Sequence, residues 1–413
     1  MKRYEAYKDS GIEWLGEIPE HWEVCRTKDI VSLINDKATD TSLKKVALEN
    51  IESKTGKYID TDSEYESEGT LFQKDDILFG KLRPYLAKVY RAEFKGQSVG
   101  DIYVFRRKND NNPDFLKYVF ISDMFISVVD GSTYGAKMPR ANWDFISNLR
   151  LAIPSIDEQR KISAYLDFKV SHIDSLISEK QKQIEDLQKY RASLISETVT
   201  RGLHPDVEMK DSGVEWLGKI PEHWEIYRTK NIVNLINERT TDTSLKKVAL
   251  ENIESGTGKY IETNSEYEGD GVLFQNDDIL FGKLRPYLAK VYKAEFKGQS
   301  IGDIYVFRGK EYNNANFLKY LFVSDLFISI VDGSTYGTKM PRANWDFISN
   351  IKLAMPSFEE QQEIADYLDE KTAKIETTIN ELKTQIENLR QYKTSVISEA
   401  VTGKVDLRDW KPK

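Results

Sequence analysis

The apolar residues of this 413-residue chain follow two spacings, and each spacing predicts a different structure. Over residues 155–200, and again over 357–402, apolar side chains recur every three, four or seven positions. This spacing is typical of a helix whose narrow apolar seam packs against a second helix. The first stretch runs for about 43 residues without glycine or proline after its start, which predicts a helix roughly 60 Å long. The best partner for each helix is the other one.

Both helices have clear start signals. Ser155-Ile156-Asp157-Glu158 and Ser357-Phe358-Glu359-Glu360 match the capping box, in which a serine and a glutamate satisfy the first backbone N–H groups. Gly202 and Pro205 end the first helix. The sequence therefore predicts two long helices with defined starts.

The remaining residues alternate short apolar runs with turns. Residues 46–48, 76–79, 102–105 and 149–153 are β-prone runs between Gly, Asp and Lys turns. One helix is predicted from Asn112-Pro113, with Asn112 as its cap, to Gly131. Short strands with helices predict a mixed α/β body, and the fold class is α+β.

The whole pattern occurs twice. Residues 9–200 recur at 211–402 with a constant offset of 202 and no insertion or deletion. Each copy is long enough to hold its own core, so the repeat is a duplicated domain. We expect a first body at 1–154, a helical region at 155–200, a linker at 201–210, a second body at 211–356, a second helical region at 357–402 and a tail at 403–413.

The two kinds of region have diverged unequally. Residues 64–107 differ from 266–309 at 7 of 44 positions, whereas 157–199 differ from 359–401 at 23 of 43. The two bodies should therefore bind the same ligand.

Composition excludes several classes of protein. No run approaches the ~20 apolar residues that cross a bilayer, and Met1–Glu5 has no apolar signal region, so we expect a cytoplasmic chain. A single cysteine, Cys25, excludes an internal disulfide framework, and the four histidines are too scattered to predict a metal centre. The net charge of −8 argues against a uniform coat of nucleic acid but leaves room for a local basic face.

Such a basic face is predicted in each body. Eight basic residues lie between Lys81 and Lys108 against only Glu93 and Asp101, with aromatic residues between them. A Lys/Arg-rich β surface with polar loops suits phosphate anchoring and contact with base edges. The alternative is a solvated β face with its aromatic residues in the core. The candidate DNA-binding residues of the first body are Lys81, Arg83, Tyr85, Lys88, Thr133, Tyr134, Lys137 and Arg140, and those of the second are Lys283, Arg285, Tyr287, Lys290, Thr335, Tyr336, Lys339 and Arg342.

Several motifs together resemble one known family. Both copies open on a motif of the form Asp9-Ser10-Gly11-Ile12-Glu13-Trp14-Leu15-Gly16, and both helices carry Glu158-Gln159 followed by Tyr165-Leu166-Asp167 or their counterparts. In this order and spacing, across essentially the whole chain, they resemble the specificity subunit of type I restriction–modification systems.

This resemblance implies a function and a set of partners. It implies two target-recognition domains (the bodies) and two helical regions that form an antiparallel coiled coil with pseudo-two-fold symmetry. The chain would recognise a bipartite site in double-stranded DNA and bind two modification subunits and the restriction subunits. Because its two bodies are nearly alike, we expect the two halves of that site to form an inverted repeat. S-adenosylmethionine, ATP and Mg²⁺ would be used by those partners, and this chain would bind no cofactor itself. Candidate residues for docking the modification subunits are Trp14, Leu15, Trp216 and Leu217. The alternative is that these residues pack the opening of each body onto its core.

A search for catalytic residues favours structural interpretations. Asn112-Pro113-Asp114-Phe115 is similar to part of an amino-methyltransferase motif, but a helix cap explains it better. Asp76 with Glu93 and Lys95 imitates the spacing of a metal-dependent nuclease cluster. The alternatives to a DNA recognition subunit are therefore a stand-alone metal-dependent nuclease and a coiled-coil scaffold that does not bind DNA. We expect no catalytic residue and no metal site.

Overall fold

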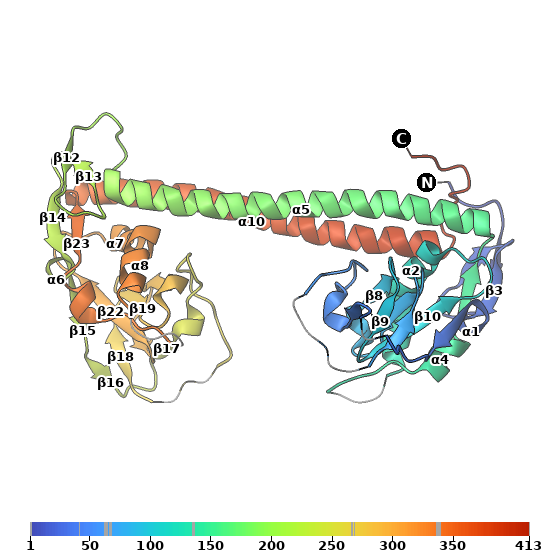
Figure 1. Ribbon diagram of the computed structural model, residues 1–413. Coiled ribbons are helices and arrows are strands. Elements are labelled where there is room, and N and C mark those ends of the chain that lie inside the picture. Colours follow the sequence, from blue (N-terminus) through green and yellow to red (C-terminus); the bar gives the residue numbers. More distant parts are fainter. Residues whose placement is uncertain are drawn as a thin grey trace. The chain divides into compact units, whose positions relative to one another are not determined.

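The structure, a computed structural model, describes residues 2–40, 42–61, 65, 68–133, 137–265, 267, 269–335 and 340–412 (Figure 1). The chain forms two compact units. Unit 1 contains residues 1–180 and 384–413, and unit 2 contains residues 181–383. Each unit therefore combines one body with part of both long helices, α5 (Ile156–Arg201) and α10 (Phe358–Val401).

Unit 1 is built on a four-stranded antiparallel sheet in the order β4-β10-β7-β8. All four residues of β7 are buried. In a sheet with one face exposed to solvent, buried and exposed residues would alternate along the strand. Ile77 and Phe79 belong to the main core, and Leu78 belongs to a second apolar cluster. Both faces of the sheet are thus covered. The four strands are β4 (Val31–Ile34), β10 (Ile102–Arg107), β7 (Ile77–Gly80) and β8 (Val89–Arg91).

Smaller elements surround this sheet. A three-stranded sheet, β5-β9-β6, supplies Val46 and Phe72 to the second cluster, and two strand pairs, β1-β2 and β3-β11, stand apart from it. Their bounds are β5 (Lys45–Val46), β9 (Gly96–Ser98), β6 (Thr70–Phe72), β1 (Tyr7–Asp9), β2 (Glu17–Pro19), β3 (Glu23–Arg26) and β11 (Arg150–Ile153). The helical elements are α1 (Thr27–Ile30), η1 (Leu48–Asn50), η2 (Pro84–Leu86), α2 (Pro113–Ile121), α3 (Asp123–Gly131) and α4 (Trp143–Asn148).

Two local predictions were wrong. The single helix predicted from Asn112 to Gly131 is divided at Ser122, whose backbone is extended and whose hydroxyl caps α3 by accepting from the Phe125 N–H (3.4 Å). The strand predicted at residues 46–48 ends at Val46, because a 3-10 turn begins at Leu48. Asn112 does cap α2, as predicted, by accepting from the Phe115 N–H (2.9 Å).

Unit 2 repeats these elements. Its four-stranded sheet has the order β15-β22-β19-β20, and a second four-stranded sheet has the order β16-β18-β21-β17. Its strands are β12 (Met209–Asp211), β13 (Lys219–Pro221), β14 (Glu225–Arg228), β15 (Val233–Ile236), β16 (Arg239–Thr240), β17 (Lys246–Val248), β18 (Gly271–Phe274), β19 (Ile279–Gly282), β20 (Val291–Lys293), β21 (Gly298–Ser300), β22 (Ile304–Gly309) and β23 (Lys352–Met355). Its short helices are α6 (Thr229–Ile232), η3 (Leu250–Asn252), η4 (Pro286–Leu288), α7 (Ala315–Val323), α8 (Asp325–Gly333) and α9 (Trp345–Ile348).

The long helices are antiparallel in unit 1. Asp174 of α5 accepts from the Lys393 ammonium of α10 (2.8 Å), and Lys180 donates to Gln385 (2.6 Å). Higher residue numbers on α5 therefore meet lower numbers on α10. The fold class is the predicted one, with mixed α/β bodies on long antiparallel helices.

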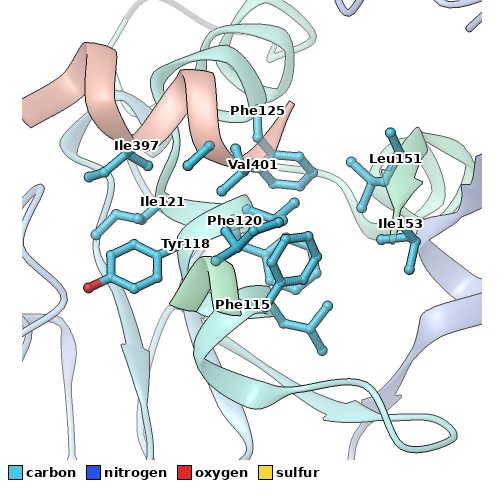
Figure 2. Close-up of a cluster of buried hydrophobic side chains, with 14 of the residues drawn as sticks. Phe115, Tyr118, Phe120, Ile121, Phe125, Leu151, Ile153, Ile397 and Val401 are labelled. Carbon is cyan, nitrogen blue, oxygen red and sulfur yellow. The ribbon is translucent and has the colours of Figure 1, made fainter. Parts of the chain in front are cut away.

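The core of each body continues into the long helices. Figure 2 shows Ile397 and Val401 of α10 beside Phe120 and Tyr118 of α2. In unit 2, Ile195 of α5 and Leu368 of α10 belong to the same apolar cluster as the α7 residues. The apolar seam predicted from the sequence thus packs on the bodies as well as on the other helix.

Buried polar groups fix the start of α5 to the body. The Trp22 indole N–H donates to Glu158 Oε1 (3.2 Å), and the Tyr4 hydroxyl donates to the same oxygen. Burial and this contact raise the pKa of Tyr4. Gln159 accepts from the Asn112 backbone N–H (2.8 Å) and donates to Pro154 O (3.0 Å). The Glu158 carboxylate therefore binds the Trp-rich opening. In unit 2 the serine of the predicted capping box does cap its helix, because the Ser357 hydroxyl accepts from the Glu360 N–H (3.3 Å).

Unit 2 has the same arrangement. The Trp224 indole N–H donates to Glu360 Oε1 (3.1 Å), and Gln361 accepts from the Asn314 N–H (2.8 Å). In both copies, therefore, the adjacent Glu and Gln at the start of the long helix hydrogen-bond to the body and hold it against the helix.

An ionic cluster makes a second link between body and helices in unit 1. Asp174 contacts Lys57 of the body (2.9 Å) as well as Lys393. In unit 2, Glu376 contacts Lys259 (3.2 Å) and Arg191 (3.8 Å). Burial alone would raise the pKa of Asp174, but hydrogen bonds from Lys393 and Lys57 hold it below its ordinary value. Each cluster joins one body to both helices.

We predict that Asp174→Asn lowers the free energy of unfolding by about 1–3 kcal/mol at neutral pH, as for other hydrogen bonds to charged groups. Because the folded pKa of Asp174 lies below the unfolded value of about 3.9, the stabilisation is present above that pH and is lost as pH falls through the folded pKa. Urea denaturation of the variant and the unaltered chain, from neutral to acid pH, measures the difference.

The matched control is Asp157→Asn, since Asp157 is 88% exposed and its pair with Arg160 should contribute little. A stability difference for Asp174→Asn that does not shrink toward acid pH would contradict the assignment.

Candidate functional site

Two loops of unit 1 are joined beside the four-stranded sheet. Leu82 and Arg140 form an isolated antiparallel bridge, the Arg83 N–H donates to Pro139 O (2.8 Å), and the Ala141 N–H donates to Lys81 O (2.7 Å). We call residues 81–87 with 137–141 the basic loop pair. In unit 2 the bridge joins Leu284 to Arg342, and the basic loop pair is 283–289 with 340–343. Lys81 and Arg83, which lie far from Arg140 in the sequence, are thus brought beside it, as are Lys283 and Arg285 beside Arg342.

The backbone of the basic loop pair is strained in both copies. Arg83 has φ 51° and Ala87 has φ 46°, and the counterparts Arg285 and Ala289 have φ 50° and 47°. A left-handed conformation costs a residue with a side chain about 1–3 kcal/mol and persists only where surrounding contacts impose it. Such strain gathers at functional sites, and here it presents the exposed Arg83 side chain.

Exposed side chains follow the strained turn. Tyr85 is 47% exposed and Tyr287 is 54% exposed. Large apolar surfaces left in water beside basic groups are suited to bases or sugars of a nucleic acid. The basic loop pair therefore offers both charge and an aromatic surface.

The Asp101 carboxylate contacts two basic side chains of the basic loop pair, Arg140 and Lys81. Arg140 donates from Nε to Asp101 Oδ1 (3.3 Å) and from Nη2 to Oδ2 (3.0 Å). The Lys81 ammonium lies 3.9 Å from Oδ1 and 5.2 Å from the centre of the Tyr103 ring. The hydrogen bonds to Asp101 raise the pKa of the Arg140 guanidinium group above its ordinary value. This carboxylate orders two of the predicted DNA-binding residues.

Asp303 has the same contacts in unit 2. Arg342 donates to it at 3.3 and 3.0 Å, and Lys283 lies 3.8 Å away. From the sequence alone, Asp101 was expected only as an isolated acidic residue in a basic stretch. The sequence signal for a specific role was its recurrence in both copies, after a glycine and inside a basic stretch.

Lys88 is placed differently from the other basic residues. Its ammonium donates to Leu48 O (2.6 Å) and Ile51 O (2.7 Å), and burial lowers its pKa. Lys290 donates to Leu250 O (2.7 Å) and Ile253 O (2.8 Å), and burial lowers its pKa too. Two of the three donors of each ammonium group are committed to backbone carbonyls of the body. Both lysines therefore fit a structural role better than the predicted phosphate contact.

The second predicted loop is described only in part. Thr133 donates its hydroxyl hydrogen to Asp130 O (2.7 Å) at the end of α3, and Thr335 donates to Asp332 O (2.8 Å). Lys137 is exposed. Tyr134, Tyr336 and Lys339 lie outside the described residues.

The predicted docking residues are mostly covered. Leu15 is 5% exposed and belongs to the main core of unit 1, so a docking role does not fit its burial. Trp14, Trp216 and Leu217 are half-buried and pack against their cores. Docking by these three residues stays a prediction.

The nuclease-like spacing has a structural explanation. Asp76 is 3% exposed and accepts from Arg106 Nε (3.0 Å) and Nη2 (2.7 Å), and from the Gln73 N–H (2.8 Å). The Asp76 carboxylate is therefore already bound by the Arg106 guanidinium group and by a backbone N–H group. Within the described residues, no cluster of three His, Cys, Asp or Glu side chains is arranged to hold a metal ion. None of the helices in the described part of the chain has an apolar stretch of the length needed to cross a membrane.

Comparison with known proteins finds one family in both copies. The family model for the type I restriction modification DNA specificity domain matches residues 19–186 and 221–388. The MjaVIII type I restriction enzyme specificity subunit of Methanocaldococcus jannaschii is 24% identical over 98% of this chain and 98% of its own. The EcoDI specificity subunit of Escherichia coli is 23% identical over 66% of each chain.

Two solved structures share the fold. A chain from a study of complex assembly and conformational transition of the type I restriction–modification system aligns with a TM-score of 0.74 at 16% identity, covering 94% of this chain and 99% of that one. The HsdS subunit of Thermoanaerobacter tengcongensis aligns with a TM-score of 0.54 at 15% identity, covering 94% and 98%.

We predict that Lys88→Met destabilises the folded chain by about 1–3 kcal/mol, because two carbonyl groups lose a charged donor. DNA affinity at each salt concentration should stay unchanged among molecules that are folded. Denaturation and DNA titration over a range of salt concentrations measure the two effects, and Lys290→Met is the matched change in unit 2. A lower salt dependence of binding with unchanged stability would instead assign Lys88 to a phosphate.

Proposed function

This chain belongs to the type I restriction modification DNA specificity domain family, and from this premise we propose that its two bodies recognise the two halves of one bipartite DNA site. It is the DNA recognition subunit of its system, and we assign no catalysis to it. One observation carries the proposal for the bodies: the same basic loop pair, with the same Asp–Arg contact and the same strained turn, recurs in both units.

The charges of the loop pair suit DNA. Arg83 is exposed on the strained turn, and Arg140 is 53% exposed at its side chain. Cationic side chains release counterions from the DNA backbone when they contact phosphates, and this release supplies affinity that does not depend on sequence. Base edges then supply specificity. In this proposal Lys81 and Arg83 contact phosphates, and Thr133, Lys137 and Arg140 lie nearer the bases.

The proposal extends to the partners. Two modification subunits would dock on the helices and on the Trp-rich openings, where Trp14, Trp216 and Leu217 keep part of their surface exposed. Restriction subunits would complete the complex in the cytoplasm. S-adenosylmethionine, ATP and Mg²⁺ would be bound by those subunits.

We predict that the target is an interrupted palindrome. Two nearly identical bodies should recognise equal half-sites. In unit 1 the acidic residue of the ionic cluster lies on α5 and the basic one on α10, and in unit 2 the reverse is true. This exchange between antiparallel helices favours inverted half-sites. Mapping methylated adenines across the genome, in cells with and without this chain, measures the motif. Methylation at a motif with unlike halves would contradict the prediction, and an unchanged methylation map would contradict the proposed function itself.

We predict that Arg83→Gln weakens binding to every DNA sequence and lowers the slope of log affinity against log salt by about one unit. Arg285→Gln should have an equal effect, since the two turns have the same backbone. Titrations of cognate and random duplexes at several salt concentrations measure the slopes. Arg160→Gln, on the exposed face of α5, is the control and should leave the slope unchanged. A loss confined to the cognate duplex would assign Arg83 to a base.

A further inference from the structure

The contact between Asp101 and Arg140 leaves a defined part of the guanidinium group free. Asp101 accepts from Nε (3.3 Å) and from one hydrogen of Nη2 (3.0 Å). A guanidinium group has five N–H donors in one plane. The donors that remain are both hydrogens of Nη1 and the second hydrogen of Nη2. One Nη1 hydrogen and this Nη2 hydrogen point the same way and form a two-pronged donor at the far end of the side chain.

This donor is held on a rigid frame. Arg140 is bridged to Leu82, and the Asp101 carbonyl accepts from the Lys81 N–H (2.9 Å), so both partners are attached to the same loop. The Tyr103 hydroxyl donates to Ala141 O (3.1 Å), which ties the residue after Arg140 to β10. Since the Arg140 side chain is 53% exposed, the arginine is oriented while its free end remains accessible.

The charge of Asp101 selects the kind of acceptor. Asp101 balances the charge of the Arg140 guanidinium through two hydrogen bonds, so this arginine attracts a phosphate less than Lys81 does, whose ammonium lies 3.9 Å from the carboxylate. Hydrogen bonds to a neutral pair of acceptors depend less on this balance of charge. In the major groove of DNA, guanine presents two neutral acceptors, O6 and N7, that match the spacing of a guanidinium fork.

We infer that Arg140 and Arg342 each bind the O6 and N7 atoms of one guanine, with Asp101 and Asp303 as positioning residues. This inference rests on the proposed function. Unit 2 supports it independently, because Arg342 donates to Asp303 at the same two distances and is 57% exposed. The consequence for the target is a guanine at the equivalent position of each half-site.

The test uses the full chain in complex with its modification subunits, first on the unaltered target and then on a target with 7-deazaguanine at one candidate position at a time. Removing N7 takes away one of the two acceptors of the pair. Binding at the position contacted should therefore weaken about 2-fold to 12-fold, which corresponds to half of the free energy of a whole bidentate contact. This measurement needs no variant and is independent of folding. If no guanine in either half-site is sensitive, the inference is wrong.

Two paired variants identify the residues. Arg140→Lys with Arg342→Lys keeps the charge and removes the fork, so the variant should lose its sensitivity to 7-deazaguanine and bind random DNA within about 2-fold of the unaltered chain. Asp101→Asn with Asp303→Asn should lower the ratio of cognate to random affinity, with random DNA bound as tightly or more tightly. Asp157→Asn with Glu359→Gln makes the same charge change on the long helices and should leave the ratio unchanged.

The outcomes separate the inference from the proposed function. Equal losses on cognate and random DNA for the arginine variants would mean that the arginines contact phosphates, and the inference would be wrong. An unaltered complex without any sequence preference would overturn the proposed function instead.

Discussion

The position of the body in unit 1 depends on a buried carboxylate at the start of α5. Glu158 is 4% exposed and accepts from the Trp22 indole and the Tyr4 hydroxyl, so its charge is compensated only when the opening of the chain is folded against α5. The desolvation of a charged group is costly without such partners, which makes this arrangement specific. Gln159 adds hydrogen bonds from the next position to the segment that starts α2. The body is thereby fixed to its helix through several groups at once.

The position of the basic loop pair depends on the body, which these hydrogen bonds fix to its long helix. One of its loops follows β7 and the other precedes α4. Ala87 and Ala141 of these loops belong to the same apolar cluster as α2 and the long helices. Within the loop pair, Asp101 repeats the same physical device at the surface: a carboxylate holds cations in a fixed orientation. The chain carries a net charge of −8, so its DNA-binding capacity depends on where the basic groups are gathered.

The features predicted well were those carried by local patterns. The apolar spacing of the long helices, the Asn112 cap and the duplicated fold each depend on residues that are neighbours in sequence or along one helix face. The errors arose where contacts span long separations. The contact between Glu158 and Trp22 was not predicted because it spans 136 residues, and Lys88 was predicted to contact a phosphate although it donates to carbonyls 37 and 40 residues away. Ser122 divides one predicted helix because its cap competes with an otherwise continuous apolar pattern. The pairing of Asp101 with Arg140 needs two loops that only the folded sheet brings together.

The central claim is that two matched bodies contact two matched half-sites. Hydroxyl-radical footprinting of the full chain, bound with its modification subunits to the mapped target, tests it most directly. The account predicts two protected patches of equal extent, related by a dyad and separated by an unprotected spacer. A single patch, or two patches of different extent without a dyad, would contradict it.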